Sequence, residues 1–532
     1  MVPRRRLPAV ALGLLPAMFL ILMLVAPLLR LSAEAGTGAS FAMLGAIWHD
    51  DYLRWRVVWS FQQAALTCVA ALVWGLPVAW VLARFEFAGR TLVLRLLMLP
   101  FVVPTLVAAM GVLALWGPRG LFSHWLGLDL QDTPWLLLYG NLFFNLCLVV
   151  RAGVDALGQV SAARVAAART LGATPWRAFW RVEWPAILPW LASALFLVFL
   201  YCFAGFGLAL ILGGQKFATV EVEIYTLVAH ELKLAQAGAL ALGMLSLTGM
   251  VALGNAMLEQ RLAAPARADT IARVRPCRAG QRWALAGALI VLVFFCAAPL
   301  LAILARALLA GAAAWSTLLD EETLAALWNT CRFTLAATAL ATALGVAHAL
   351  AARQSVWLRA AAFLPFVVSP VTVAFGLLLL YPQWSASMFL LVAAYALLAY
   401  PFVAKSLGAA LDSLPQHLLQ AARSLGATPA RVFWRVTLPL VAPALRRGMA
   451  FAAATSLGEF AVTLFLSRPE WATLTTLIYQ RLGRPGALNR DAALLLAALL
   501  MVLALAAFVL IERAPRRASQ RDEPALTGLA HA

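Results

Sequence analysis

The sequence predicts an all-α polytopic membrane protein with about twelve transmembrane helices, arranged as two parallel repeats of six. Three observations support this fold class. Of the 532 residues, 64% are hydrophobic and only 12% are charged, and the mean hydropathy is +0.88. Long apolar runs recur along the chain, and one polar segment between them occurs twice. A soluble protein of this length would need far more polar surface.

Each predicted span is an apolar run long enough to cross about 30 Å of hydrocarbon. The runs cover residues 7–29, 57–82, 92–115, 134–152, 190–212, 236–258, 283–309, 329–352, 360–381, 386–408, 447–467 and 490–511. The first run is too long for the hydrophobic region of a signal peptide, so we interpret it as a membrane anchor.

The distribution of charge predicts the orientation of these spans. With the N-terminus in the cytoplasm, the cytoplasmic loops hold 29 of the 41 Lys and Arg residues but only 9 of the 23 acidic residues. This is the positive-inside bias of membrane proteins, and it places both termini in the cytoplasm. The formal net charge of +18 therefore reflects topology, and we expect no nucleic-acid partner.

The polar segment that occurs twice is the most informative feature of the chain. The first copy, Ala167 to Pro189, reads AARTLGATPWRAFWRVEWPAILP, and the second, Ala421 to Pro443, reads AARSLGATPARVFWRVTLPLVAP. Fifteen of the 23 aligned positions are identical, which shared membrane composition does not explain. The repeat extends further, because Leu99–Val103 recurs as Leu364–Val368 and Gly111 recurs as Gly376.

The repeat divides the chain into two halves of about six spans each. We expect a first half at residues 1–258, a cytoplasmic linker at 259–282, a second half at 283–512 and a cytoplasmic tail at 513–532. An even number of spans per half leaves both repeated loops, at 155–189 and 409–446, on the same face. The halves are then related by a pseudo-two-fold axis along the membrane normal.

Within each repeated loop the sequence predicts two short helices separated by breaks. Gly172 is positioned to end the first helix, and Thr174-Pro175 supplies an N-cap and first residue for the second. We expect Pro185 and Pro189 to interrupt the chain before the next span. An amphipathic hairpin at the lipid surface would explain the second helix. It does not explain the small residues of the first helix, which favour close docking against a soluble protein.

The repeated loop resembles the cytoplasmic signature E-A-A-x-x-x-G-x(9)-I-x-L-P of permease subunits of binding-protein-dependent ABC importers. The resemblance implies a type I ABC importer permease fold in a bacterial inner (plasma) membrane, with both halves fused in one chain. It also implies partners: membrane lipid, an external (periplasmic) substrate-binding protein and two copies of an ATPase subunit that bind ATP and Mg. By the same resemblance the loops are coupling loops that dock on the ATPase. The implied docking residues are Ala166, Ala167, Ala168, Arg169, Leu171, Gly172, Gln420, Ala421, Ala422, Arg423, Leu425 and Gly426. The glutamate that begins the family signature is replaced by Ala166 and Gln420, so any salt bridge of that glutamate is absent here.

Fusion of two permease halves is typical of two groups within this family, the thiamine (and thiamine pyrophosphate) permeases and the ferric-iron permeases. Stretches such as Phe143–Leu146 and Leu212–Gly214 resemble the thiamine group more closely. The resemblance therefore implies import of thiamine or its phosphates, with ferric iron as the alternative. A more distant alternative is an ion-coupled secondary transporter, which would require several charges inside the membrane.

Three residues are candidates for the substrate path. Glu459 is the only acid well inside a predicted span, where charge is costly, and the first half has Gly205 in its place. It can equally be a structural carboxylate. Asn141 and Asn145 lie four residues apart on one helix face, where they can line a cavity or link helices by hydrogen bonds.

We expect no catalytic residues, no metal site and no cofactor in this chain. No phosphate-binding G-x-x-x-x-G-K-[ST] motif is present, so ATP hydrolysis falls to a separate subunit. The six cysteines form no C-x-x-C pair and no metal-ligand spacing.

Overall fold

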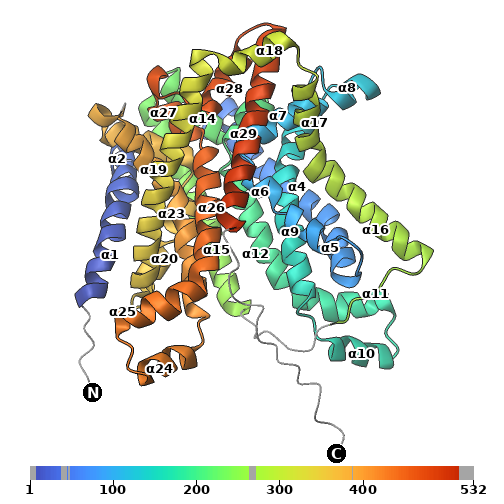
Figure 1. Cartoon of the computed structure of the whole chain (residues 1–532). Coiled ribbons are helices and arrows are strands. Elements are labelled where there is room, and N and C mark those ends of the chain that lie inside the picture. Colours follow the sequence, from blue (N-terminus) through green and yellow to red (C-terminus); the bar gives the residue numbers. More distant parts are fainter. Residues whose placement is uncertain (1–6, 37–44, 46–47, 263–270, 386, 514–532) are drawn as a thin grey trace, which may run out of the picture.

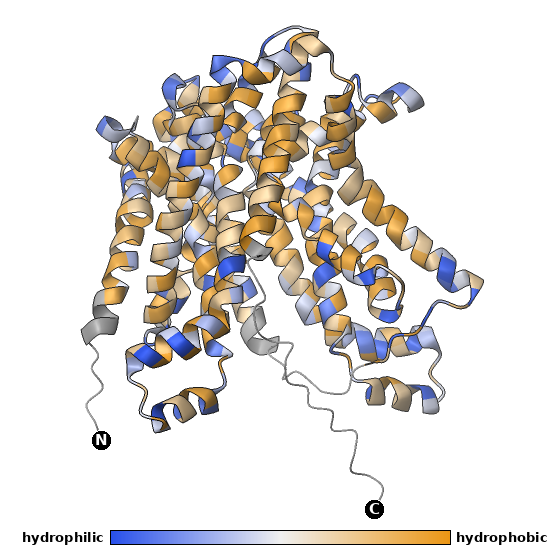
Figure 2. Ribbon diagram, viewed as in Figure 1, coloured by the Kyte–Doolittle hydropathy of each residue, from blue (hydrophilic) through white to orange (hydrophobic). Residues whose placement is uncertain are grey.

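The computed structural model describes residues 7–36, 45, 48–262, 271–385 and 387–513, and all but the first residue of the predicted tail lies outside them. The described residues form a bundle of helices that is apolar through its middle (Figures 1 and 2). The elements of the first half are α1 (Leu7–Leu20), π-helix η1 (Ile21–Val25), α2 (Ala26–Gly36), α4 (Asp51–Arg84), α5 (Arg90–Leu96), α6 (Leu99–Val102), α7 (Thr105–Trp116), α8 (Leu121–Leu126), α9 (Pro134–Leu157), α10 (Ala162–Thr170), α11 (Pro175–Ala178), π-helix η2 (Phe179–Glu183), α12 (Trp184–Phe203), α13 (Gly207–Leu212), α14 (Val220–Ala229) and α15 (Leu234–Leu262).

The second half repeats this order of elements. They are α16 (Ala279–Leu292), π-helix η3 (Val293–Ala297), α17 (Ala298–Leu308), α18 (Ala312–Ser316), η4 (Thr317–Leu319), α19 (Glu321–Ala352), α20 (Val356–Ala361), α21 (Leu364–Val367), α22 (Pro370–Leu380), η5 (Pro382–Trp384), α23 (Met388–Asp412), α24 (Gln416–Ser424), α25 (Pro429–Val432), π-helix η6 (Phe433–Thr437), α26 (Leu438–Leu457), α27 (Ala461–Leu466), η7 (Pro469–Trp471), α28 (Leu474–Gly483) and α29 (Ala487–Arg513). The helices of the two repeated loops, α10 with α11 and α24 with α25, project from the same end of the bundle (Figure 1).

The described residues contain ten helices long and apolar enough to cross a membrane, or eleven if one bent pair forms a single span. The prediction of a continuous span at 360–381 is wrong, because the chain bends by 97° between α21 and α22. The predicted span at 92–115 is also wrong, because α5, α6 and α7 divide it. Continuous spans at 190–212 and 447–467 are wrong as well. Helix α12 ends at Phe203 and α26 at Leu457, and a short separate helix follows each break. Two arginines, Arg446 and Arg447, lie inside α26, which is not among the ten.

The proline interruption predicted between the repeated loops and the next spans is wrong. In the first half, α11, η2 and α12 form one continuous helical run from Pro175 to Phe203. The π turn of η2 absorbs the proline at position 185: Trp184 N–H bonds to the carbonyl of Phe179 five residues back. The second half contains an equivalent π turn, in which Leu438 N–H donates to the carbonyl of Phe433.

Hydrogen bonds that position equivalent helices confirm that the halves share one scaffold. The Ser60 hydroxyl of α4 accepts the first N–H of α14, from Val220, at 2.8 Å. In the second half the Thr330 hydroxyl of α19 accepts the corresponding N–H of Leu474 at 2.9 Å. Both hydroxyls satisfy a helix N-terminus that would otherwise lack a partner.

The additional helix of each half packs against the opposite half. α1 and α2 contact α19 and α22 of the second half, whereas α16 and α17 contact α4 and α7 of the first (Figure 1). The repeated glycines lie at these crossings. A Cβ on Gly111 would come within 2.7 Å of the Pro299 carbonyl oxygen, and one on Gly376 within 3.0 Å of Pro27. The sequence division at residue 258 therefore does not separate two independently packed units.

We expect Gly111→Val and Gly376→Val each to lower the thermal unfolding midpoint of the purified chain, because the added side chain overlaps the crossing helix. Overpacking of this kind costs about 1–3 kcal/mol. Gly287→Val in α16 is the matched control, since a Cβ there meets nothing within 4 Å. Equal losses in all three variants would show that helix propensity, and not the crossing, sets the cost.

Candidate functional site

The first helix of each repeated loop ends as the sequence predicts. Gly172 follows α10 with a φ of +84°, and Gly426 follows α24 with a φ of +78°. In each copy the residue after the glycine closes the turn through a backbone hydrogen bond to the carbonyl five residues earlier, at 3.0 and 3.1 Å. This is the Schellman geometry. The residue after the helix adopts a left-handed conformation there, which glycine tolerates best because it has no Cβ.

The second helix of each loop also begins as predicted. The Thr174 hydroxyl accepts the N–H of Arg177 at 3.3 Å, and the Thr428 hydroxyl accepts that of Arg431 at 3.4 Å. A proline occupies the first helical position in both copies. The caps hold the two short helices at a defined angle.

Most of the predicted docking residues are accessible on the end of the bundle. Leu171 and Leu425, at equivalent positions beside the two glycines, are 88% and 89% exposed. Ala168 and Ala422 are half-buried, and the other predicted docking residues are exposed. A large apolar side chain is therefore exposed at the same position in both copies of the loop.

The first loop is held to the bundle by an ion pair that the second loop lacks. Nη2 of Arg84, at the end of α4, lies 2.6 Å from Oε2 of Glu183, which closes η2, and both side chains are largely buried. Thr437 occupies the position of Glu183 in the second half. The linker contacts the same end of α4. Val274 N–H donates to the Arg84 carbonyl and Glu86 N–H donates to the Val274 carbonyl, each at 3.0 Å.

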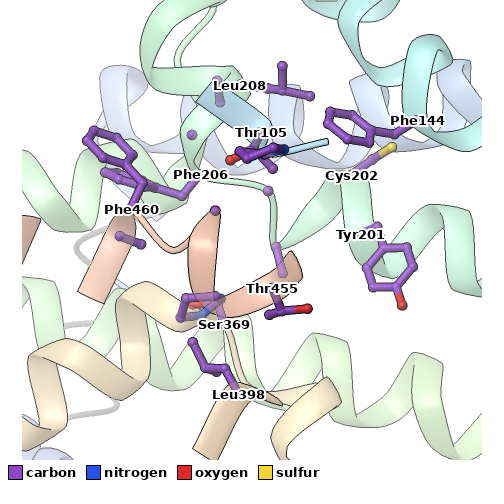
Figure 3. A pocket seen from close by; sticks show the side chains of 18 of the residues that line it. Thr105, Phe144, Tyr201, Cys202, Phe206, Leu208, Ser369, Leu398, Thr455 and Phe460 are labelled. Atoms are coloured by element: carbon purple, nitrogen blue, oxygen red, sulfur yellow. The ribbon is translucent and has the colours of Figure 1, made fainter. Parts of the chain in front are cut away.

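A central cavity of about 320 Å³ lies between the halves (Figure 3). Both helix breaks, Ala204–Phe206 and Gly458–Phe460, line it, and they stand 254 residues apart like the repeated loops. The rings of Phe206 and Phe460 stack across the junction with centroids 5.9 Å apart. The volume lies at the lower end of the range of about 300–1,000 Å³ found for small-molecule sites.

Glu459 lies in one of these breaks and lines the cavity. The sequence predicted that Glu459 lies inside a continuous span. This prediction is wrong, because the residue lies in the break between α26 and α27. Its Oε1 accepts the N–H of Val462 at 3.0 Å and so caps α27, and the residue as a whole is 9% exposed. The side chain therefore caps a helix, as a structural carboxylate would, and it also lines the cavity.

Asn141 and Asn145 also line the cavity and link helices. Asn141 Nδ2 donates to Oε1 of Gln63 in α4 at 2.7 Å. Asn145 Nδ2 donates to the carbonyl of Asn141 at 2.9 Å and lies 3.3 Å from the Cys202 sulfur. Asn145 is 3% exposed, and its Oδ1 has no hydrogen-bond partner among the described residues.

The chemistry of the cavity wall favours a cation with apolar or aromatic surface. None of the described residues that line it is basic, and Glu459 is the acid among them. Seven aromatic side chains contribute to the wall: Phe101, Phe144, Tyr201, Phe206, Phe366, Phe402 and Phe460. Aromatic faces attract cations, most strongly where water is excluded.

A second buried carboxylate joins the halves next to the cavity. Ser369, which lines the cavity from the second half, donates its hydroxyl to Oε2 of Glu221 in the first half at 2.7 Å. Burial raises the pKa of Glu221 to about 8, and the hydrogen bond from Ser369 opposes that rise. The sequence analysis did not select Glu221, Ser369 or Gln63. A polar Gln62-Gln63 pair inside an apolar run was the available signal for Gln63.

The family described as the binding-protein-dependent transport system inner membrane component matches residues 71–264 and, a second time, residues 339–519. The chain belongs to this family. The two matches fall one in each half, which confirms two permease domains and excludes the ion-coupled alternative.

Two curated relatives match nearly the whole chain, and a third matches less than half of it. The thiamine transport system permease protein ThiP of Escherichia coli is 29% identical over 511 residues, covering 90% of this chain and 92% of that protein. ThiP of Salmonella typhimurium is 29% identical over 537 residues, covering 96% and 97%. The sulfate transport system permease protein CysT of E. coli is 31% identical over 227 residues, covering 41% of this chain and 80% of its own length.

Family membership settles the general role of the chain. It is a multi-pass inner membrane permease of a binding-protein-dependent ABC importer, and it is a transport subunit without a catalytic domain. ATP is bound by a partner ATPase, and a substrate-binding protein is the second partner.

We expect Glu183→Ala to lower the free energy of unfolding by about 3 kcal/mol, because it leaves the largely buried Arg84 guanidinium without its carboxylate. The matched control is Thr437→Ala at the equivalent position, which removes no ion pair. Denaturant unfolding of the purified chain measures both. A loss for Glu183→Ala no larger than that for Thr437→Ala would contradict the assigned role of the ion pair.

Proposed function

We propose that this chain imports thiamine, or a thiamine phosphate, from an external binding protein into the cytoplasm. The observation that carries the proposal is the central cavity, whose wall combines Glu459 with seven aromatic side chains and, among the described residues, no basic ones. Thiamine is an organic cation with two aromatic rings, so a carboxylate and aromatic faces complement it. Similarity to two proteins named as thiamine permeases over nine-tenths or more of the chain supports the same cargo.

Ferric iron, the alternative, fits the cavity less well. A hard trivalent cation requires several oxygen ligands, and carboxylates supply them best. Glu459 is the acid that lines the described wall, and most of the rest is hydrocarbon and aromatic carbon. Sulfate, the cargo in the name of CysT, is an anion and would meet this carboxylate without a compensating basic group.

In the proposed mechanism the two repeated loops are coupling helices, and each docks on one copy of the ATPase. The proposed contacts are the twelve residues predicted from the sequence, from Ala166 to Gly172 and from Gln420 to Gly426. Their exposure and the open leucines support this role. Closure of the ATPase dimer moves the loops together and rotates the halves about the pseudo-two-fold axis, which opens the cavity to the other side of the membrane.

The same proposal includes the topology. The chain makes twelve crossings, with α26 as one of them, and its loop end and both termini face the cytoplasm. Surface lipid contacts the aromatic and basic side chains of the second loop helices, where Trp176 and Trp434 are exposed. The excess of Lys and Arg in the predicted cytoplasmic loops supports this orientation.

Deletion of the gene is expected to abolish uptake of labelled thiamine at nanomolar concentration, and the wild-type gene should restore it. The experiment is performed in cells that retain the partner ATPase and binding protein. Unchanged uptake in the deletion strain would exclude thiamine as the cargo. The same strains should then be tested with labelled ferric iron.

The double variant Gly172→Val, Gly426→Val is expected to reduce recovery of the ATPase with the tagged permease about tenfold or more. A β-branched residue at a left-handed position costs roughly 1–2 kcal/mol per site and reshapes both docking turns. Gly127→Val is the control, because Gly127 has a φ of +65° but follows α8 at the other end of the bundle. Normal ATPase recovery by the double variant would contradict docking through these turns.

A further inference from the structure

The central cavity has two chemically different ends, and the polar groups at the two ends, Glu459 and Asn145, come from different halves of the chain. At one end Phe206 and Phe460 lie together, and Glu459 precedes Phe460 in the break (Figure 3). At the other end lie Phe144 and Cys202, and Asn145 contacts Cys202 (Figure 3). A ligand that fills the cavity therefore meets a carboxylate at one end and a carboxamide at the other.

The carboxamide end offers a hydrogen-bond acceptor. The Asn145 amide is oriented by its own donor, because Nδ2 bonds to the carbonyl of Asn141 and must therefore be the nitrogen. Its Oδ1 is buried and has no partner among the described residues. A buried acceptor left unpaired destabilises the protein, and a ligand that donates a hydrogen bond to it removes that cost.

The same end is absent from the second half, so the arrangement is not a by-product of the repeat. Ala399 occupies the position equivalent to Asn145, and Tyr395 that of Asn141, when the halves are aligned at the 254-residue offset. Conversely, the first half has Gly205 at the position equivalent to Glu459. Each half has therefore supplied one recognition group and left the matching position of the other half without it.

We propose that the cavity binds its cargo in one orientation, with a cationic ring against Glu459 and the Phe206–Phe460 pair and a hydrogen-bond donor directed at Asn145 Oδ1. The inference rests on the proposed function and narrows its substrate class to heteroaromatic cations that carry a donor remote from the charge. Thiamine fits, with a thiazolium charge on one ring and an amino group on the other. Because Glu459 and Asn145 belong to different halves, a cargo that bridges them binds only one arrangement of the halves and is released when they move.

The proposed orientation allows the contributions of Asn145 and Glu459 to cargo recognition to be tested separately. Uptake of labelled thiamine is compared with uptake of its analogue that carries hydrogen in place of the pyrimidine amine, both at subsaturating concentration and with the ATPase and binding protein present. The ratio of the two uptakes measures recognition of the amine. Any preference of the binding protein enters every variant equally, so changes in the ratio report on the permease.

For Asn145→Leu we expect the ratio of thiamine to analogue uptake to fall about tenfold, which is the effect of one lost hydrogen bond. For Glu459→Gln we expect uptake of both compounds to fall about tenfold or more while the ratio stays unchanged, because both carry the same charge. Thr248→Val, which removes a buried hydroxyl in α15 outside the cavity, should leave the ratio and both uptakes at wild-type values. Immunoblots of membranes and ATPase recovery check that each variant is inserted and assembled.

The outcomes distinguish this inference from the proposed function. If Asn145→Leu lowers both uptakes equally, Asn145 has only a structural role and the orientation is wrong, although thiamine import stands. Uptake of both compounds by Glu459→Gln at the wild-type level also overturns it. Failure of the wild-type chain to take up thiamine overturns the proposed function and the inference together.

Discussion

Every backbone polar group inside an apolar helix bundle must find its partner within the protein, and the central cavity exists because two helices break without violating that constraint. The break after α26 is closed by Glu459, which caps α27, and by the hydroxyls of Thr463 and Thr475, which donate to the Glu459 carbonyl at 3.2 and 3.1 Å. In the first half Thr219 donates to the Gly205 carbonyl at 3.5 Å. Without these partners the backbone carbonyls at the two breaks would lack hydrogen bonds in apolar surroundings.

Once the backbone groups at the two breaks have hydrogen-bond partners, the two pseudo-symmetric halves can have different side chains at equivalent positions. Ser60 and Thr330 position equivalent helices, and the glycines at 111 and 376 admit equivalent crossing helices. The residues that depart from this symmetry gather at the cavity and at the first repeated loop. When the two halves are aligned, Glu459 corresponds to Gly205, Asn145 to Ala399, and Glu183 to Thr437. The common positions maintain the shared fold, and the unequal ones make the cavity wall and the first repeated loop differ between the halves.

Local features of the repeated loops could be predicted because they depend on residues only a few positions apart. The left-handed glycines and the Thr-Pro caps occur as expected, since helix-end chemistry is short-range. The straight spans at 190–212, 360–381 and 447–467 failed for the opposite reason. Hydropathy measures how apolar a segment is, and it is insensitive to a sharp bend when both arms are apolar. The continuous helix through Pro185 was missed because a π turn, and not the proline alone, decides whether the helix ends.

The sequence by itself determined the membrane class, the duplication and the turn geometry of both repeated loops, because composition and short-range capping do not need a partner element. It also singled out Glu459, Asn141 and Asn145 as polar groups in apolar surroundings. Only the tertiary structure decided that the additional helices cross to the opposite half and that Glu183 meets Arg84. It alone brought Glu459 and Asn145 to one cavity, because Asn145 lies on α9 of the first half and Glu459 lies in the break after α26 of the second, and only helix packing sets the distance between them.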